Sequence, residues 1–161
     1  MPGNNVKRYA TAAFVRFDKL GRLTRAEYEV QIRQAVEHKF EGKNESELRR
    51  VYEIELRRAE PLLRDLDAVD CTFRILKGEI EPGEDLPTTR NGPEIAAALS
   101  AVYFGLYREK PSQFRISDRV RSYAMRTAYA DERTVWRWIS RGIEIFAHVR
   151  GLVLDNNETN Q

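Results

Sequence analysis

Most of this chain repeats apolar residues every three or four positions, which is the period of an amphipathic helix. No stretch alternates apolar and polar residues convincingly enough to predict a strand. A first helix is expected over residues 7–20, and Gly21 ends it. Thr24 and Glu27 have the spacing of a capping box, which predicts a second helix running to about Phe40. We therefore expect an all-α fold.

A long third helix is expected from Asn44, which repeats the capping signature with Glu47, to about Leu76. Pro61 is expected to bend it. Its second half carries apolar residues that alternate three and four positions apart: Ala59, Leu62, Leu66, Val69, Phe73 and Leu76. This spacing forms a narrow seam that can pair with another helix. Packing of the seam within the same chain is favoured, and a dimer seam is the alternative.

The stretch 77–93, KGEIEPGEDLPTTRNGP, contains three prolines and three glycines among polar residues. This composition is typical of a linker. The predicted organisation is therefore a helical packing or oligomerisation region over residues 1–76, the linker, a helix-turn-helix region over 94–154, and a polar tail over 155–161.

Local signals also predict the helices after the linker. Pro93 suits the first turn of a helix, which is expected to cover residues 94–108. Ser117 is a good N-cap for a helix over about 118–129. The last helix is expected over about 132–153.

The stretch 122–140, SYAMRTAYADERTVWRWIS, is typical of two short helices joined by a tight polar turn. In a helix-turn-helix unit, an aliphatic residue of the second helix fills the joint, and Val135 is placed to do so. Ala124 and Met125 would then lie on the inward face of the first helix. Tyr129 would lie at the turn, where glycine is more usual.

The helix from residue 132 combines an apolar face with a polar one, and Trp138, Ile139 and Phe146 are expected in the core. The residues expected on its exposed side are Glu132, Arg133, Trp136, Arg137 and Ser140. The DNA major groove admits one helix, whose N-terminal side chains read the bases. Arg133 and Arg137 lie one turn apart, so each could contact a guanine.

Other side chains are candidates for contact with DNA phosphates, which position a protein without reading sequence. Thr134 and Arg141 lie on the last helix, and Arg119, Arg121 and Arg126 lie on the helix before it. Residues 108–150 hold ten Lys and Arg against five Asp and Glu, a local net charge of +5, whereas the whole chain carries +2. A basic C-terminal third suits a phosphate-binding surface.

The run ERTVWRWISRGIEIFAHVRGL resembles the C-terminal helix-turn-helix of phage late-transcription regulators of the ArpU/RinA kind. It is more distantly similar to the region-4 helix-turn-helix of sigma factors. The matching residues are Asp131, Arg133, Thr134, Val135, Trp136, Arg137, Arg141, Gly151 and Leu152. The resemblance covers about the last 60 residues. It implies sequence-specific DNA binding near a phage or prophage promoter or packaging region.

Several functional classes receive no support from the sequence. No apolar run approaches the roughly 20 residues of a membrane span, and the N-terminus lacks the apolar core of a secretory signal. We therefore expect no membrane partner and a cytoplasmic location. Cys71 is the only cysteine, which excludes an intrachain disulfide. His38 and His148 lie far apart, and no phosphate loop or HExxH motif occurs. No catalytic residue, metal site or cofactor is expected.

The leading hypothesis is a transcription regulator that binds double-stranded DNA. Its N-terminal helices would form a homodimer or hold a partner such as RNA polymerase. One alternative is a phage small-terminase-like packaging subunit, in which an oligomeric ring recognises DNA. The other is a helical adaptor or inhibitor that binds only protein, favoured by the near-neutral charge and the acidic N-terminal half.

Overall fold

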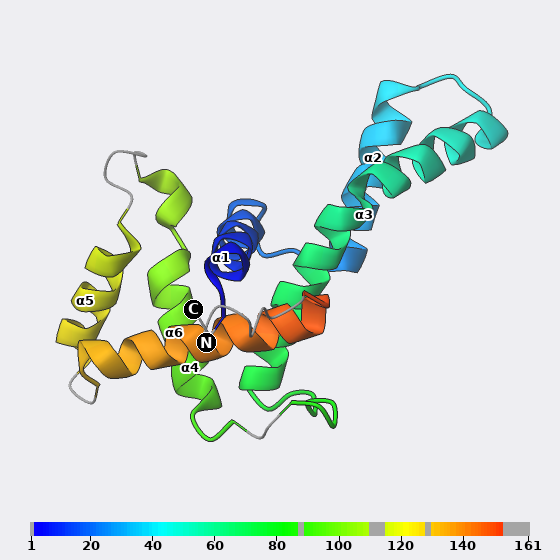
Figure 1. Ribbon diagram of the computed structural model, residues 1–161. Coiled ribbons are helices and arrows are strands. Elements are labelled where there is room, and N and C mark those ends of the chain that lie inside the picture. The colour runs from blue at the N-terminus through cyan, green and yellow to red at the C-terminus, as the bar shows by residue number, and fades with distance from the viewer. Residues whose placement is uncertain (1, 87–88, 110–114, 128–129, 153–161) are drawn as a thin grey trace.

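The computed structural model describes residues 2–86, 89–109, 115–127 and 130–152, and its regular structure is helical throughout (Figure 1). In chain order the helices are α1 (Asn4–Lys19), α2 (Arg25–Lys39), α3 (Glu45–Leu76), α4 (Gly92–Tyr103), the 3₁₀ turn η1 (Leu106–Arg108), α5 (Ile116–Arg126) and α6 (Glu132–Arg150). The expected all-α class is confirmed for the described residues.

Side-chain caps define the starts of two helices as predicted. The Thr24 hydroxyl accepts a hydrogen bond from the Glu27 N–H, and the Glu27 carboxylate accepts one from the Thr24 N–H. The Asn44 side-chain oxygen accepts a hydrogen bond from the Glu47 N–H at 2.9 Å. Each bond satisfies a backbone N–H that has no partner within its helix.

The helix predicted over 94–108 is shorter than expected. α4 ends at Tyr103, and Gly105 separates it from η1 with a φ of 82°, in the left-handed region that favours glycine. The Gly105 N–H donates to the Asp18 carboxylate of α1 at 2.7 Å. This contact with a distant helix holds the break in place.

Both ends of α5 differ from the predicted range of about 118–129. The expectation that Ser117 is the N-cap was wrong, because α5 begins at Ile116 and Arg115 takes the N-cap position without a side-chain hydrogen bond. Ser117 lies inside the first turn. α5 ends at Arg126, and the predicted extension to Tyr129 falls outside the described residues.

Two further helix ends differ from the prediction by a few residues. α1 begins at Asn4 rather than Lys7. α6 ends at Arg150, before the predicted end at residue 153. Gly151 takes a φ of 79°, and backbone N–H groups close the last turn as in a Schellman cap.

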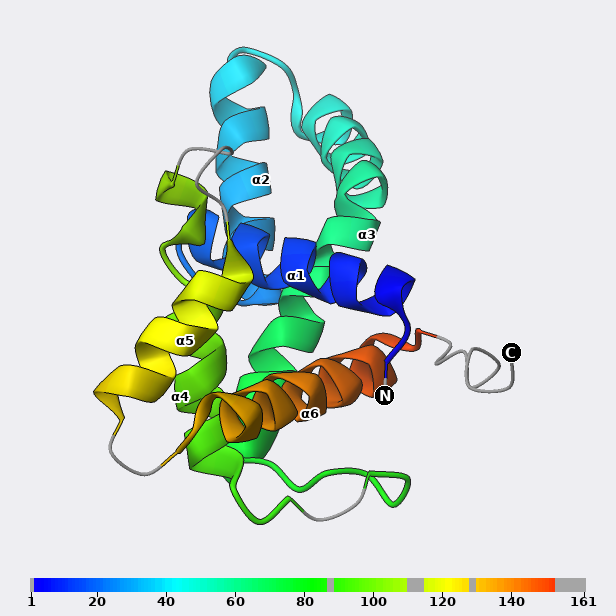
Figure 2. The ribbon, with the colours of Figure 1, turned by 60° about the vertical axis from the view of Figure 1, so that its left-hand side comes forward.

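The helices form a body and a projecting arm (Figures 1 and 2). The body contains α1, α4, α5, α6 and the second half of α3. The arm consists of α2 packed along the first half of α3, and Val36 is the one buried residue of α2. α3 runs through Pro61 without interruption, and Figure 1 shows it changing direction along its length.

One hydrophobic core joins helices from both sides of the loop at residues 77–91. Phe14 of α1 lies at its centre. Its ring centroid is 6.2 Å from that of Phe73, 5.2 Å from that of Tyr103 and 5.3 Å from that of Phe146. The N-terminal helices and the C-terminal helices therefore bury each other's apolar faces.

The seam on α3 packs within its own chain. Leu66, Val69, Phe73 and Leu76 are each 8% exposed or less, and all belong to the shared core. The favoured alternative from the sequence is thus confirmed for these four residues, which are not available to pair with a second copy.

An ion pair at the edge of the core ties three helices together. The Asp65 carboxylate of α3 accepts hydrogen bonds from the Tyr9 hydroxyl at 2.6 Å and from the Arg150 side chain at 2.7 Å. The Asp65 and Arg150 side chains are only 18% and 16% exposed. Burial, followed by the bond to Asp65, raises the pKa of Tyr9. The network fixes α1 and α6 against α3.

Gly92→Ala is expected to destabilise the fold by about 1–3 kcal/mol, because an added Cβ overpacks this position. That Cβ would lie 2.1 Å from the backbone carbonyl oxygen of Leu76, which a side-chain rotation cannot relieve. Gly83→Ala is the matched control, since its Cβ would meet nothing within 4 Å. Thermal unfolding of both variants checks this. Equal melting temperatures would show that the start of α4 does not depend on this close approach.

Candidate nucleic-acid interface

The last three helices, α4, α5 and α6, each pack against the other two (Figure 2). Val120 of α5 and Val135 of α6 are completely buried, and Ile139 is 2% exposed. The predicted burial of Val135 and Ile139 is confirmed. The apolar face of α6 is thus held by the body of the protein, while its polar face remains outside.

The inward face of α5 is only partly as predicted. Ala124 packs against the core, but Met125 is 82% exposed, so its expected inward position was wrong. Neighbouring residues of a helix point about 100° apart, since 3.6 residues make one turn. The apolar face of α5 is narrow enough that Ala124 packs on the core while its neighbour Met125 points to solvent. Tyr129, expected at the turn, lies outside the described residues.

A side-chain cap holds the first turn of α6. The Asp131 carboxylate accepts a hydrogen bond from the Thr134 N–H at 2.8 Å. Hydrogen bonds from the Thr134 side chain and backbone, in that order, lower the pKa of Asp131. The carboxylate therefore stays charged at the positive end of the helix dipole. Asp131 thus caps the helix through the backbone N–H of Thr134, a residue expected to contact phosphate.

The exposed face near the start of α6 carries Arg133, Trp136 and Arg137 as predicted, and Trp136 is 38% exposed. Ser140 is half-buried. Within the described part of the chain, neither Arg133 nor Arg137 forms an ion pair. Two guanidinium groups, one turn apart, are therefore open to a ligand on this face.

Other predicted contact residues already have protein partners. Arg121 of α5 lies 3.6 Å from the carboxylate of Glu132, which joins the two helices. Arg141 donates to Glu144 at 2.9 Å and is 29% exposed. Arg126 is exposed and donates to the Ser122 carbonyl of its own helix. A phosphate at Arg121 or Arg141 would have to exchange with a carboxylate.

Arg119 is a structural residue, contrary to its expected contact with phosphate. Its guanidinium donates to the carbonyl oxygens of Val102 and Phe104 at 3.1 and 2.8 Å, and to the Glu109 carboxylate at 2.8 Å. A cation near the last carbonyls of a helix satisfies groups that lack partners within it. Arg119 therefore closes the C-terminus of α4 and fixes α5 against it.

The structure adds one cation that sequence reasoning missed. A hollow of about 370 Å³ lies between α6 and the end of the loop, and Arg90, Arg137 and Arg141 line it together with Trp138. Trp138, expected in the core, is half-buried and packs against its edge while lining this hollow. No local signal marks Arg90, because a tertiary contact determines its position. Gly92 packs closely on Leu76 of α3, and Arg90, two residues earlier, lies beside α6.

Neither the described helices nor the comparisons with known proteins add a further function class. Among the described residues, every helix is too short or too polar to cross a membrane. No protein-family model, curated protein or solved structure matches this chain.

Proposed function

We propose that this protein is a sequence-specific regulator of transcription that binds double-stranded DNA and reads the major groove with the start of α6. The exposed pair Arg133 and Arg137 is the observation that carries the proposal. Arginine contacts guanine through two parallel hydrogen bonds, each such pair contributing about 1–3 kcal/mol of discrimination. A reading helix must also be rigid, and burial of Val135 and Ile139 holds α6 from behind.

Nearby cations and the sequence resemblance support the same function. Arg126 and Arg90 are exposed and add positive charge near α6, which attracts DNA phosphates. The resemblance of residues 131–152 to phage regulators of the ArpU/RinA kind favours a promoter of a phage or prophage as the target. A homodimer and contact with RNA polymerase remain part of this proposal.

Selection from a random pool of DNA duplexes, at roughly 50 and 200 mM salt, tests the proposal. Enrichment of one sequence motif is expected, and a two-fold repeat in it would indicate a dimer. Salt-sensitive binding without a motif would favour the packaging function. Light scattering then checks whether the protein forms a large oligomeric ring. No binding at either salt concentration would contradict DNA binding and favour a protein-binding adaptor.

Arg141→Ala is expected to weaken binding to all duplexes by a similar factor, because Arg141 is placed for phosphate rather than base contact. The slope of log affinity against log salt should fall by about one. Arg57→Ala, an exposed cation on the arm, is the control and should leave the slope unchanged. An unchanged slope in Arg141→Ala would show that its bond to Glu144 persists on DNA.

A further inference from the structure

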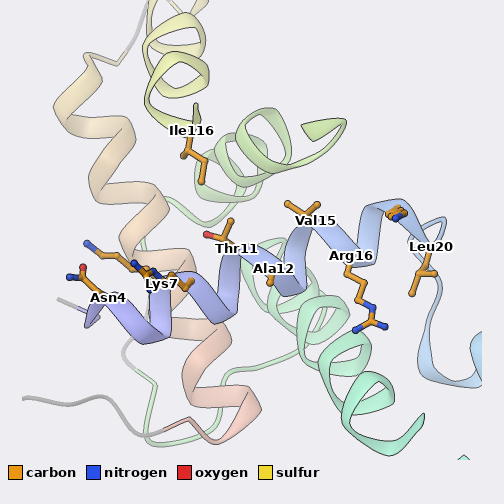
Figure 3. A pocket seen from close by; sticks show the side chains of 10 residues that line it. Asn4, Lys7, Thr11, Ala12, Val15, Arg16, Leu20 and Ile116 are labelled. Carbon is orange, nitrogen blue, oxygen red and sulfur yellow. The ribbon is translucent and has the colours of Figure 1, made fainter. Parts of the chain in front are cut away.

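A groove of about 1080 Å³ runs along the outer face of α1 and reaches the start of α5 (Figure 3). Its apolar lining consists of Ala12, Val15, Leu20 and Ile116. Figure 3 shows Thr11 and Val15 on the side of α1 toward Ile116. The four cations of the groove lie on α1, whereas Arg133 and Arg137, proposed to read DNA, lie on α6.

Among the described residues, the charged lining of this groove is entirely basic. Its cations are Lys7, Arg8, Arg16 and Lys19, and no ion pair engages any of them within the described part of the chain. Asp18, the one acid of α1, is turned to other partners: it pairs with Arg22 at 2.9 Å, accepts the Gly105 N–H and is 9% exposed. The groove therefore carries positive charge that the described residues do not pair.

The cations lie toward the two ends of the groove, and Ala12 and Val15 lie between them along α1. Lys7 and Arg8 are near the start of α1, and Arg16 and Lys19 are near its end. A helix rises 1.5 Å per residue, which separates the two basic ends by about 12–18 Å along the axis. Val15 and Ile116 supply apolar surface between those ends.

We propose that this groove binds an amphipathic helix of a protein partner, with apolar residues in its centre and carboxylates near both ends. The carboxylates would lie 8–12 residues apart on that helix, about the separation of the two basic ends. Helix-in-groove recognition combines apolar anchors with complementary charge at the rim. Nucleic acid fits less well, because its phosphates gain nothing from the apolar centre. The inference does not depend on DNA binding by α6.

The probe is a fluorescein-labelled helical peptide of about 18 residues, with glutamates near both ends and leucines between them. A peptide of the same composition in scrambled order is its control. Fluorescence anisotropy with the full chain should show at least about tenfold tighter binding of the ordered peptide, since about 1.4 kcal/mol separates affinities tenfold.

Arg8→Glu/Arg16→Glu should reduce binding of the ordered peptide by about tenfold or more, because each end of the groove then repels a carboxylate. Arg50→Glu/Arg57→Glu changes two exposed cations of the arm and should leave binding unchanged. Circular dichroism checks that both variants are folded. If the groove variant does not fold, Lys19→Glu at an exposed position replaces it.

Equal binding of the two peptides, or of wild type and the groove variant, would overturn the proposal. A duplex DNA probe provides a separate readout. Loss of DNA binding in the groove variant, with peptide binding unchanged, would overturn the proposal and assign these cations to nucleic acid. The expected result is that the groove variant loses peptide binding while its response to the DNA probe equals that of wild type, whether or not wild type binds DNA.

Discussion

Arg137→Ala is expected to remove the preference of this protein at the base pair that Arg137 contacts, while leaving its fold intact. Arg137 is exposed, forms no ion pair among the described residues, and lies one turn beyond Arg133 on the open face of α6. Loss of a bidentate guanine contact removes about 1–3 kcal/mol of discrimination, or roughly 5–150-fold. Competition between the selected duplex and a duplex with that base pair changed measures this effect.

Two results would separate the possible roles of Arg137. Equal specificity in wild type and Arg137→Ala would remove it from base reading. Because Arg137 also lines the hollow with Arg90 and Arg141, it could instead contact phosphate. A uniform loss on all duplexes, with a salt slope lower by about one, would indicate that role. Arg133→Ala provides the parallel measurement one turn earlier.

Phe14→Ala is expected to destabilise the whole body, not α1 alone. Truncation of a buried phenylalanine costs about 3–5 kcal/mol, a large part of the 5–15 kcal/mol that stabilises a typical domain. Phe14 is fully buried and contacts rings from α3, α4 and α6. Both tryptophans of the chain lie on α6, so their fluorescence reports on a helix distant in sequence. The fluorescence transition and the far-ultraviolet circular dichroism transition should therefore shift together.

Val30→Ala is the control for this prediction, because Val30 is 50% exposed on the arm. Its melting temperature should stay close to that of wild type. A Phe14→Ala variant that loses helix content at lower temperature, with unchanged tryptophan fluorescence, would show two regions that unfold independently. That result would contradict a single cooperative core.

Local signals predicted the helices of this protein well. The starts at Thr24 and Asn44 follow from side chains that bond backbone N–H groups three residues later. The open and buried faces of α6 follow from helical period, which places Val135 inside and Arg137 outside. Such features depend on neighbours in sequence, so composition and spacing contain them.

Part of the candidate interface could not be predicted in this way. Arg119 and Arg137 are both arginines on C-terminal helices, yet one closes α4 and the other is exposed. Arg90 joins the interface only because its loop packs beside α6. Periodicity indicates which face of a helix is polar, but not which of its polar groups find partners within the protein.

The sequence was sufficient for the all-α class, most helix starts and the exposed arginine pair, because short-range hydrogen bonds and helical period set these features. Only the tertiary structure showed that the α3 seam packs in its own chain and that Phe14 joins helices across the loop. It also revealed the basic groove on α1. An amphipathic pattern shows that a face must be buried, whereas its partner depends on contacts between residues far apart in the chain.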